Sequence, residues 1–317
     1  MLISSAALTW LSHDSSILIE DLYKIPALLF RCDRRILNSP PHFECFIKAL
    51  NFFSVAVRCD LRLKMMMSSA KFMSLSQHQK QTGENERKEK EHLTGAYMDS
   101  QHSVVIHALI EVCDSKRMLD DEKDFEMIEK RKQIVHIACE YMHRVFIDFE
   151  GLLKVVLYQK FPLHQIRVLV DGIPSLFTAT SYITEMLTLV DPQRRIFAIV
   201  LASELCRKYR VRETLDMARV VCDIVHSLQK YGALPSSNRL WKHVVPAMIL
   251  FATEFPSLTD CITRLLNRVV ANARNRIAVR YGLLAGDPRH EEYQLIATIT
   301  AFLEGTEKRK AKNTVTV

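Results

Sequence analysis

The stretch from Phe161 to Tyr231 constrains the fold of this chain more than any other part of it. Apolar residues recur through it at the three- and four-residue spacing of helices, and every break falls at a proline, glycine or aspartate. The clearest helix is expected at 212–230, which has one apolar and one polar side. The apolar side of this helix holds Leu215, Ala218, Val221, Cys222, Val225 and Leu228, and its polar side holds Asp216, Arg219, Asp223, Ser227 and Lys230. No catalytic pattern interrupts the helices of this stretch, which favours a scaffold over an enzyme.

The composition supports a helical fold with a sizeable core. The 317 residues are 48% hydrophobic, enough for one elongated domain or two compact ones. Only 8 glycines and 10 prolines are present, and so few turn formers favour helices over a turn-rich β fold. The formal net charge of +7 is mild. It would suit acidic partners or nucleic acid, although a mixed solvated surface with a basic tail explains it more simply.

The spacing of the helices predicts an all-α fold of stacked helical pairs, a HEAT/armadillo-like α-solenoid. Helix starts recur about every 20 residues, so that a helical pair spans about 40. In the helix expected at 193–209, Phe197, Ala198, Leu201 and Leu205 share an apolar face, with Ser203 and Arg207 turned away. The expected helices are 126–147, 150–158, 163–171, 175–189, 193–209, 212–230, 239–254 and 258–279.

Changes in composition divide the chain into four segments. Residues 1–73 form an N-terminal helical segment, in which Phe43, Ile47 and Leu50 lie on one helical face. Residues 74–98 are rich in charged and amide side chains and are predicted to be a flexible linker. The α-helical repeat domain is predicted at 99–285, followed at 286–317 by a C-terminal helix and a basic tail.

Neither a cofactor nor a metal site is predicted. His136, Cys139 and His143 share a helical face, but zinc would need a fourth ligand, and such faces are more often core or partner-facing. The carboxylate pairs Asp120–Asp121 and Glu291–Glu292 lie in charge-rich stretches, so both are expected to be solvated. No phosphate-binding glycine loop is present.

The eight cysteines indicate the compartment rather than a site. No C-x-x-C pair occurs, and the cysteines sit in apolar helical stretches, which is typical of free thiols in a reducing compartment, cytosol or nucleus. No uncharged apolar run reaches the length of a membrane span, so none is predicted.

Arginines are concentrated on the last long helix. The candidate contact residues are Arg264 and Arg268, four residues apart, and Arg276 and Arg280, also four apart. Arg274 lies between them, and further basic residues follow in the tail at Lys308, Arg309, Lys310 and Lys312. This stripe would contact RNA phosphates or an acidic protein surface, unless it is simply a solvated face. An RNA-binding helical-repeat protein is therefore the alternative to a protein scaffold.

An ordered series of short motifs resembles the C-terminal region of the Integrator complex subunit 2 family. The resemblance covers residues 99 to 275, whereas the N-terminus and the tail after Arg276 do not match clearly. Proteins of this family are much longer, so the chain looks like a C-terminal fragment or a shortened gene product. The motifs are Phe161-Pro162-Leu163, Gly172-Ile173-Pro174-Ser175, Ile183-Thr184-Glu185-Met186-Leu187, Arg195-Ile196-Phe197-Ala198-Ile199, Val245-Pro246 and Phe255-Pro256-Ser257-Leu258.

The resemblance implies a non-catalytic α-helical subunit of the nuclear Integrator complex. Its partners would be other Integrator subunits and, indirectly, RNA polymerase II and protein phosphatase 2A. The complex processes the 3′ ends of small nuclear RNAs and attenuates transcription, and a different subunit cleaves the RNA. The family provides no catalytic residues that would map onto this sequence.

Overall fold

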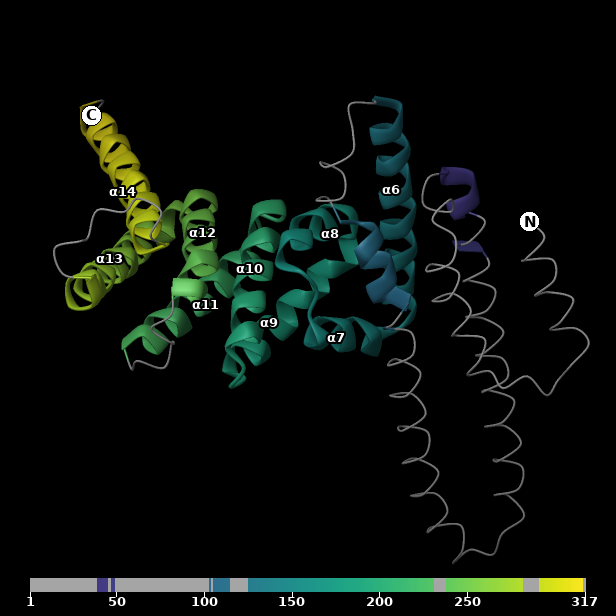
Figure 1. Cartoon of the computed structure of the whole chain (residues 1–317), viewed down its shortest axis with the longest axis horizontal. Coiled ribbons are helices and arrows are strands. Elements are labelled where there is room, and N and C mark those ends of the chain that lie inside the picture. The colour runs from purple at the N-terminus through teal and green to yellow at the C-terminus, as the bar shows by residue number, and fades with distance from the viewer. Residues whose placement is uncertain are drawn as a thin grey trace, which may run out of the picture. The chain divides into compact units, whose positions relative to one another are not determined.

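The computed structural model describes residues 39–44, 47–48, 103, 105–114, 125–230, 238–281 and 291–315 (Figure 1). Within these ranges all regular structure is helical and no strand occurs, so the predicted all-α class is confirmed. The linker predicted at 74–98 and most of the segment 1–73 lie outside the described residues. The chain divides into two units, Met1–Leu176 and Phe177–Val317, and the predicted repeat domain at 99–285 spans this division.

The first unit is organised around α6 (Phe125–Asp148). Helix α7 (Glu150–Gln159) and helix α8 (Ile166–Gly172) both pack on α6, and the 3-10 turn η2 (Leu163–Gln165) leads into α8. Residues 105–112 are also helical. The core consists of apolar side chains that are at most 1% exposed, among them Leu109, Ala138, Met142, Leu152, Leu157 and Ile166.

Two hydrogen bonds tie residues 105–114 to the end of α7 and to η2. His107 Nε2 lies 2.9 Å from Oε1 of Gln159, and His164 Nε2 lies 3.0 Å from Oδ1 of Asp114. Lys160 caps the C-terminal end of α7; it is a non-glycine residue with a φ of 65°, and its backbone N–H donates to the Leu157 and Val156 carbonyls. The two side-chain hydrogen bonds thus hold residues 105–114 against the end of α7 and against η2.

The second unit is a set of longer helices with α10 (Pro192–Lys208) at its centre. Helix α10 packs against α9 (Thr180–Thr188), α11 (Arg212–Lys230) and α12 (Asn238–Glu254). The 3-10 turns η3 (Pro174–Ala179) and η4 (Pro256–Leu258) precede α9 and α13. Helix α13 (Thr259–Tyr281) contacts α12 and α14 (Glu291–Val315), and α14 also contacts α12 (Figure 1).

The start of α10 shows why the chain turns into a helix at this point. The Asp191 carboxylate accepts a hydrogen bond of 2.9 Å from the Gln193 backbone N–H, and Pro192 occupies the first helical position. Aspartate is favoured at the N-cap because its carboxylate accepts a hydrogen bond from a free backbone N–H. Proline is favoured at the first helical position because it has no backbone N–H that would be left without a partner. This beginning agrees with the predicted one within a single residue.

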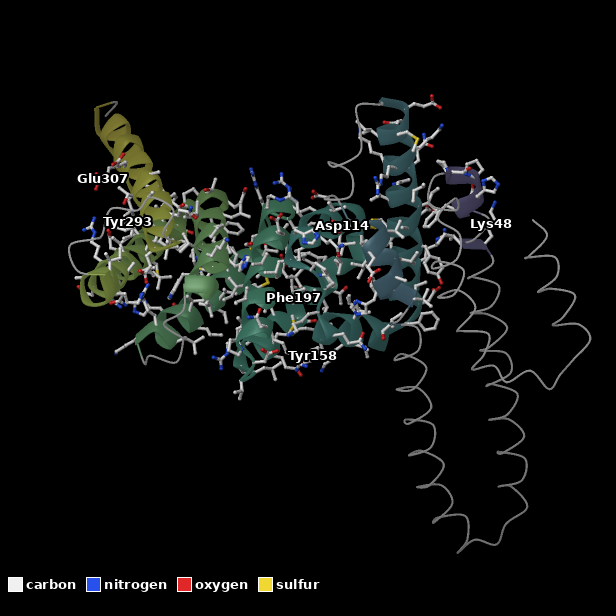
Figure 2. The ribbon with its side chains drawn as sticks, in the orientation of Figure 1. Lys48, Asp114, Tyr158, Phe197, Tyr293 and Glu307 are labelled. Atoms are coloured by element: carbon white, nitrogen blue, oxygen red, sulfur yellow. The ribbon has the colours of Figure 1, made fainter. Side chains whose placement is uncertain are left out.

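Helix α10 differs from the prediction in how much of it is buried. Ser203 was expected to turn away from the apolar face, but it is only 2% exposed, and its hydroxyl donates a 2.8 Å hydrogen bond to the Val200 carbonyl. Three neighbouring helices cover α10, so its buried residues extend around most of its circumference and only one strip, with Val200, Glu204 and Arg207, is half-buried. Phe197, labelled in Figure 2, is 1% exposed. A single stripe is therefore the wrong description of this central helix.

Helix α11 has the predicted two-sided character. It begins and ends at the predicted residues, 212 and 230. Ala218, Val221, Cys222 and Val225 are buried, Leu215 and Leu228 are half-buried, and the five polar positions opposite them are exposed. Elsewhere the main difference is that the helices predicted at 163–171, 175–189 and 258–279 are preceded or begun by 3-10 turns.

Candidate functional site

The predicted arginine stripe divides into residues with different environments. Arg264 and Arg268 are exposed on α13, as is Arg274. Arg276 instead faces α14, where its Nε donates a 3.1 Å hydrogen bond to Oε1 of Glu292, and its side chain is 18% exposed. The side chain of Arg280 lies outside the described residues.

Glu292 corrects the expectation that the Glu291–Glu292 pair is solvated. Its side chain is 1% exposed and lies against Arg276. Nothing in the local sequence distinguishes it from a surface glutamate, because its burial arises from α14 packing on α13 and α12. A buried carboxylate needs such a partner, since an unpaired charge in the interior is strongly destabilising.

The helical period accounts for only part of this division of the stripe. At about 100° per residue, Arg276 lies about 120° around α13 from Arg264, while Arg268 lies only about 40° away. The four-residue spacing correctly paired Arg264 with Arg268, but it did not place the two pairs on one face. Rotation alone does not separate Arg274 from Arg276, because each lies about 80° from one arginine of the Arg264–Arg268 pair and about 120° from the other. The packing of α14 on α13 is what covers Arg276 and leaves Arg274 exposed.

The three residues weighed as metal ligands make separate contacts. His136 is exposed, and Cys139 is buried beside Cys113. Nδ1 of His143 accepts a 3.2 Å hydrogen bond from the backbone N–H of Ser175. Within the described ranges no group of three or more His, Cys, Asp or Glu residues is arranged to hold a metal ion.

The described cysteines are free thiols in the packed interior. Cys113, Cys139, Cys206 and Cys222 are buried, while Cys261 is half-buried. Burial raises the pKa of the Cys222 thiol to about 12, and burial likewise raises the pKa of Cys206. A hydrogen bond with Cys139, together with burial, raises the pKa of Cys113. Thiols held in the protonated form are poor nucleophiles, so these positions favour packing over catalysis.

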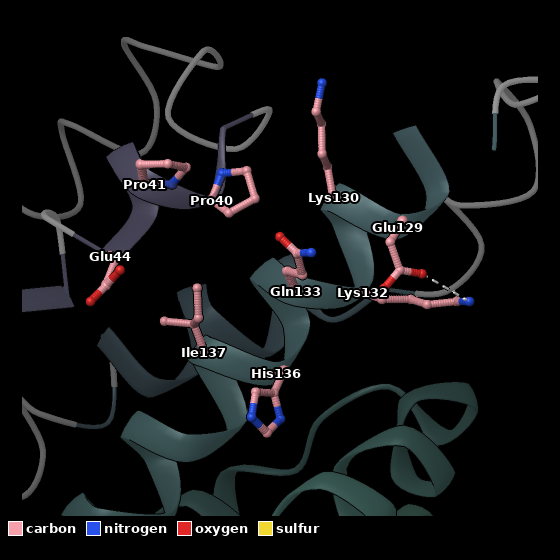
Figure 3. A pocket seen from close by; sticks show the side chains of 9 residues that line it. All are labelled: Pro40, Pro41, Glu44, Glu129, Lys130, Lys132, Gln133, His136 and Ile137. Carbon is pink, nitrogen blue, oxygen red and sulfur yellow. Dashed lines mark hydrogen bonds and ion pairs between the residues drawn. The ribbon is translucent and has the colours of Figure 1, made fainter. Parts of the chain in front are cut away.

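An open pocket of about 710 Å³ lies between residues 40–44 and α6 (Figure 3). Its charged side chains include Lys132 and Glu129, whose Nζ and Oε2 atoms are 3.5 Å apart. Figure 3 shows Gln133 and Ile137 directed toward the proline-containing segment. No nucleophile beside a base lines it, so its chemistry does not resemble a catalytic site. The lining residues are Pro40, Pro41, Glu44, Glu129, Lys130, Lys132, Gln133, His136 and Ile137.

The helices of the described ranges include none that is long and apolar enough to cross a membrane. The predicted helix at 239–254, the most apolar candidate, is α12, and its buried residues Val244, Met248 and Phe251 lie in the core of the second unit.

The family model and the curated proteins that match this chain belong to the same family. The model of the family described as Integrator complex subunit 2 matches residues 4–278. The match begins well before residue 99, so the relationship extends further toward the N-terminus than the sequence motifs indicated. It includes Arg264, Arg268, Arg274 and Arg276.

Several curated relatives carry the name Integrator complex subunit 2. The Gallus gallus protein is 23% identical over 273 residues, and the Homo sapiens protein is 22% identical over 279 residues. Both alignments cover 78% of this chain and 23% of the relative. The Drosophila melanogaster protein is 27% identical over 179 residues, covering 56% of this chain and 16% of the relative. The matched part of the chain thus spans 16% to 23% of the length of these curated relatives, and the chain belongs to the Integrator complex subunit 2 family.

Proposed function

We propose that this chain is a non-catalytic scaffold subunit of the Integrator complex, which it joins through protein–protein contacts. The family match over residues 4–278 carries this proposal. The helical interior supports it, because the ordered apolar side chains are used to pack helices together. The buried, protonated thiols also favour a structural role over an enzymatic one.

The proposal includes the cellular setting of that complex. The chain would act in the nucleus, where the complex supports 3′-end processing of small nuclear RNAs and regulation of RNA polymerase II transcription. Its direct partners would be other Integrator subunits, with the polymerase and protein phosphatase 2A as indirect ones. Free cysteines fit a reducing compartment of this kind.

The scaffold would be built from stacked helical pairs, as in a HEAT/armadillo-like solenoid. Successive packing in the second unit supports this arrangement: α10 contacts α9 and α12, α12 contacts α13, and α13 contacts α14. In such arrays each pair buries its apolar face on the next pair, and the exposed edges are free to hold partners. Small-angle X-ray scattering of the purified chain would test this architecture, and a spherical particle would contradict it.

Affinity purification of the tagged full chain from nuclear extract, followed by mass spectrometry, tests the function. The expected result is specific recovery of named Integrator subunits, and their antibodies should recover the tagged chain in the reverse experiment. The variant Leu201→Asp, which places a charge in the core, should recover none of them. A well-folded wild-type chain that recovers no Integrator subunit would contradict the proposal.

A further inference from the structure

Helix α13 carries an exposed face that is rich in arginine and asparagine. The helix contains five arginines and a single acidic residue, Asp260 in its first turn. Between residues 264 and 278, no exposed position holds a carboxylate. We call this surface the arginine face; it consists of Arg264, Asn267, Arg268, Asn272, Arg274 and Asn275, together with the small residues Ala271 and Ala278.

The positive charge of the arginine face is not neutralised within the described part of the chain. Arg264 Nε donates to the Asp260 backbone carbonyl over 3.3 Å, and Arg268 Nη1 lies 3.0 Å from Nε2 of His226. No ion pair with Arg274 occurs there either. The neighbouring helix α11 differs, because its exposed Arg212 and Arg219 both approach the carboxylate of Asp216.

The chemistry of the arginine face favours phosphate over a protein partner. Protein interfaces usually centre on buried aromatic or large apolar anchors. In the described ranges the large exposed apolar side chains are Ile147, Val190, Val211 and Val220, and none of them lies on α13. Guanidinium and carboxamide groups are instead donors to phosphate oxygens. The small alanines leave room for a backbone to approach closely.

We propose that the arginine face binds the phosphodiester backbone of nucleic acid. From Arg264 to Arg274 the helix rises about 15 Å, so the three arginines are spread over several successive phosphates. The face has no aromatic residue on which bases would stack, so recognition is independent of base sequence. Arg276 is not part of the face, since it is held by Glu292.

Fluorescence anisotropy of the full chain with a labelled 20-nucleotide single-stranded oligouridylate tests this binding. Three neutralised phosphates give a slope of log affinity against log salt of about −2, and affinity falls about twentyfold between 50 and 200 mM salt. The variant R264E/R268E/R274E should bind at least tenfold more weakly than a control with the same net charge. That control, R144E/R167E/R212E, reverses three exposed arginines on other helices.

Three results would overturn the proposal. These are undetectable binding at 50 mM salt, an equal loss of affinity in the control variant, and displacement of the RNA by polyglutamate at matched charge concentration. The last would assign the face to acidic protein segments. Circular dichroism checks that the variants are folded, and R264Q/R268Q/R274Q replaces the charge-reversal variant if that one unfolds. The result is independent of recovery of Integrator subunits, so either proposal can fail alone.

Discussion

Arg276 and Glu292 join two helices through a hydrogen-bonded ion pair at the edge of the core. The Nε–Oε1 distance is 3.1 Å, and the side chains are 18% and 1% exposed. Arg276 lies on α13 and Glu292 is in the first turn of α14, so the ion pair holds the N-terminal end of α14 against α13. A carboxylate near a helix N-terminus also interacts favourably with the helix dipole.

We expect removal of Arg276 alone to destabilise the second unit strongly. Arg276→Gln leaves the Glu292 carboxylate buried without its cation, which typically costs about 3–5 kcal/mol. The loss should appear as a lower urea midpoint and as faster amide exchange in α14. Arg274→Gln, an exposed neighbour on the same helix, is the control and should change stability by less than about 0.5 kcal/mol. Equal effects of the two variants would show that the ion pair does not anchor α14.

Gly172 permits the close approach of α8 to α6. A Cβ at this position would lie 2.6 Å from Sγ of Cys139 and 3.0 Å from its Cβ. We therefore expect Gly172→Ala to destabilise the first unit by about 1–3 kcal/mol, as overpacking does. Thermal unfolding of the purified chain would measure the change.

The contact with Cys139 can be isolated by a second substitution. In the Cys139→Ala background the sulfur contact is absent and only the 3.0 Å contact with the Cβ remains, so Gly172→Ala should cost less there. Gly305 is the matched control, because a Cβ at this position meets nothing within 4 Å. Gly305→Ala lies inside α14 and should stabilise the chain by up to about 1 kcal/mol. An undiminished cost of Gly172→Ala in the absence of the sulfur would contradict this explanation.

A substitution at Leu201 tests whether α10 is buried at the centre of the second unit. Its side chain is 0% exposed, and a carboxylate there would be buried without a partner. Leu201→Asp should lower the free energy of unfolding by several kcal/mol, enough to unfold the second unit. The control is Val190→Asp, at a position that is 88% exposed, which should leave the melting curve almost unchanged. An unaltered melting curve for Leu201→Asp would contradict the burial of α10.

Thr214 links the turn after α10 to the start of α11. Its hydroxyl oxygen lies 2.6 Å from the Tyr209 carbonyl oxygen and accepts a 3.3 Å hydrogen bond from the Val211 N–H. Thr214→Val keeps the shape but removes these bonds, so we expect a loss of about 1–2 kcal/mol in chemical denaturation. The same substitution at exposed Thr184 should have almost no effect.

Cys222 should make stability sensitive to alkaline pH. Burial raises the pKa of this thiol from 9.0 to about 12 in the folded chain. Between these values the unfolded chain loses the proton first, so the free energy of unfolding falls as pH rises. Each such thiol contributes about 1.4 kcal/mol per pH unit.

The pH effect of Cys222 is measured by difference. Urea unfolding under reducing conditions from pH 8.5 to 11 should show a steeper decline for the wild type than for Cys222→Ala. Other groups titrate in this range in both proteins, and their contribution cancels in the comparison. Parallel pH profiles would contradict the structure, because they would show that burial does not raise the pKa of the Cys222 thiol.

The position of the helices could be predicted well from the sequence. The apolar stripe of 212–230 and the Asp191–Pro192 start define their helices through local physics, namely side-chain periodicity and the satisfaction of free N–H groups. Such signals depend on residues a few positions apart. The family resemblance seen in the sequence rests on the same kind of information, because it follows the order of short local motifs.

Only the tertiary structure decided which polar residues are buried. Ser203 and Glu292 have no local feature that distinguishes them from surface residues, and their burial comes from the other helices that pack around them. The same holds for Arg276, which packing turns toward a carboxylate while Arg264 and Arg268 stay exposed. Periodicity along a helix therefore determined the elements of this protein. The partner of each charged side chain depended on how those elements pack, because burial and ion pairing are set by neighbours in space.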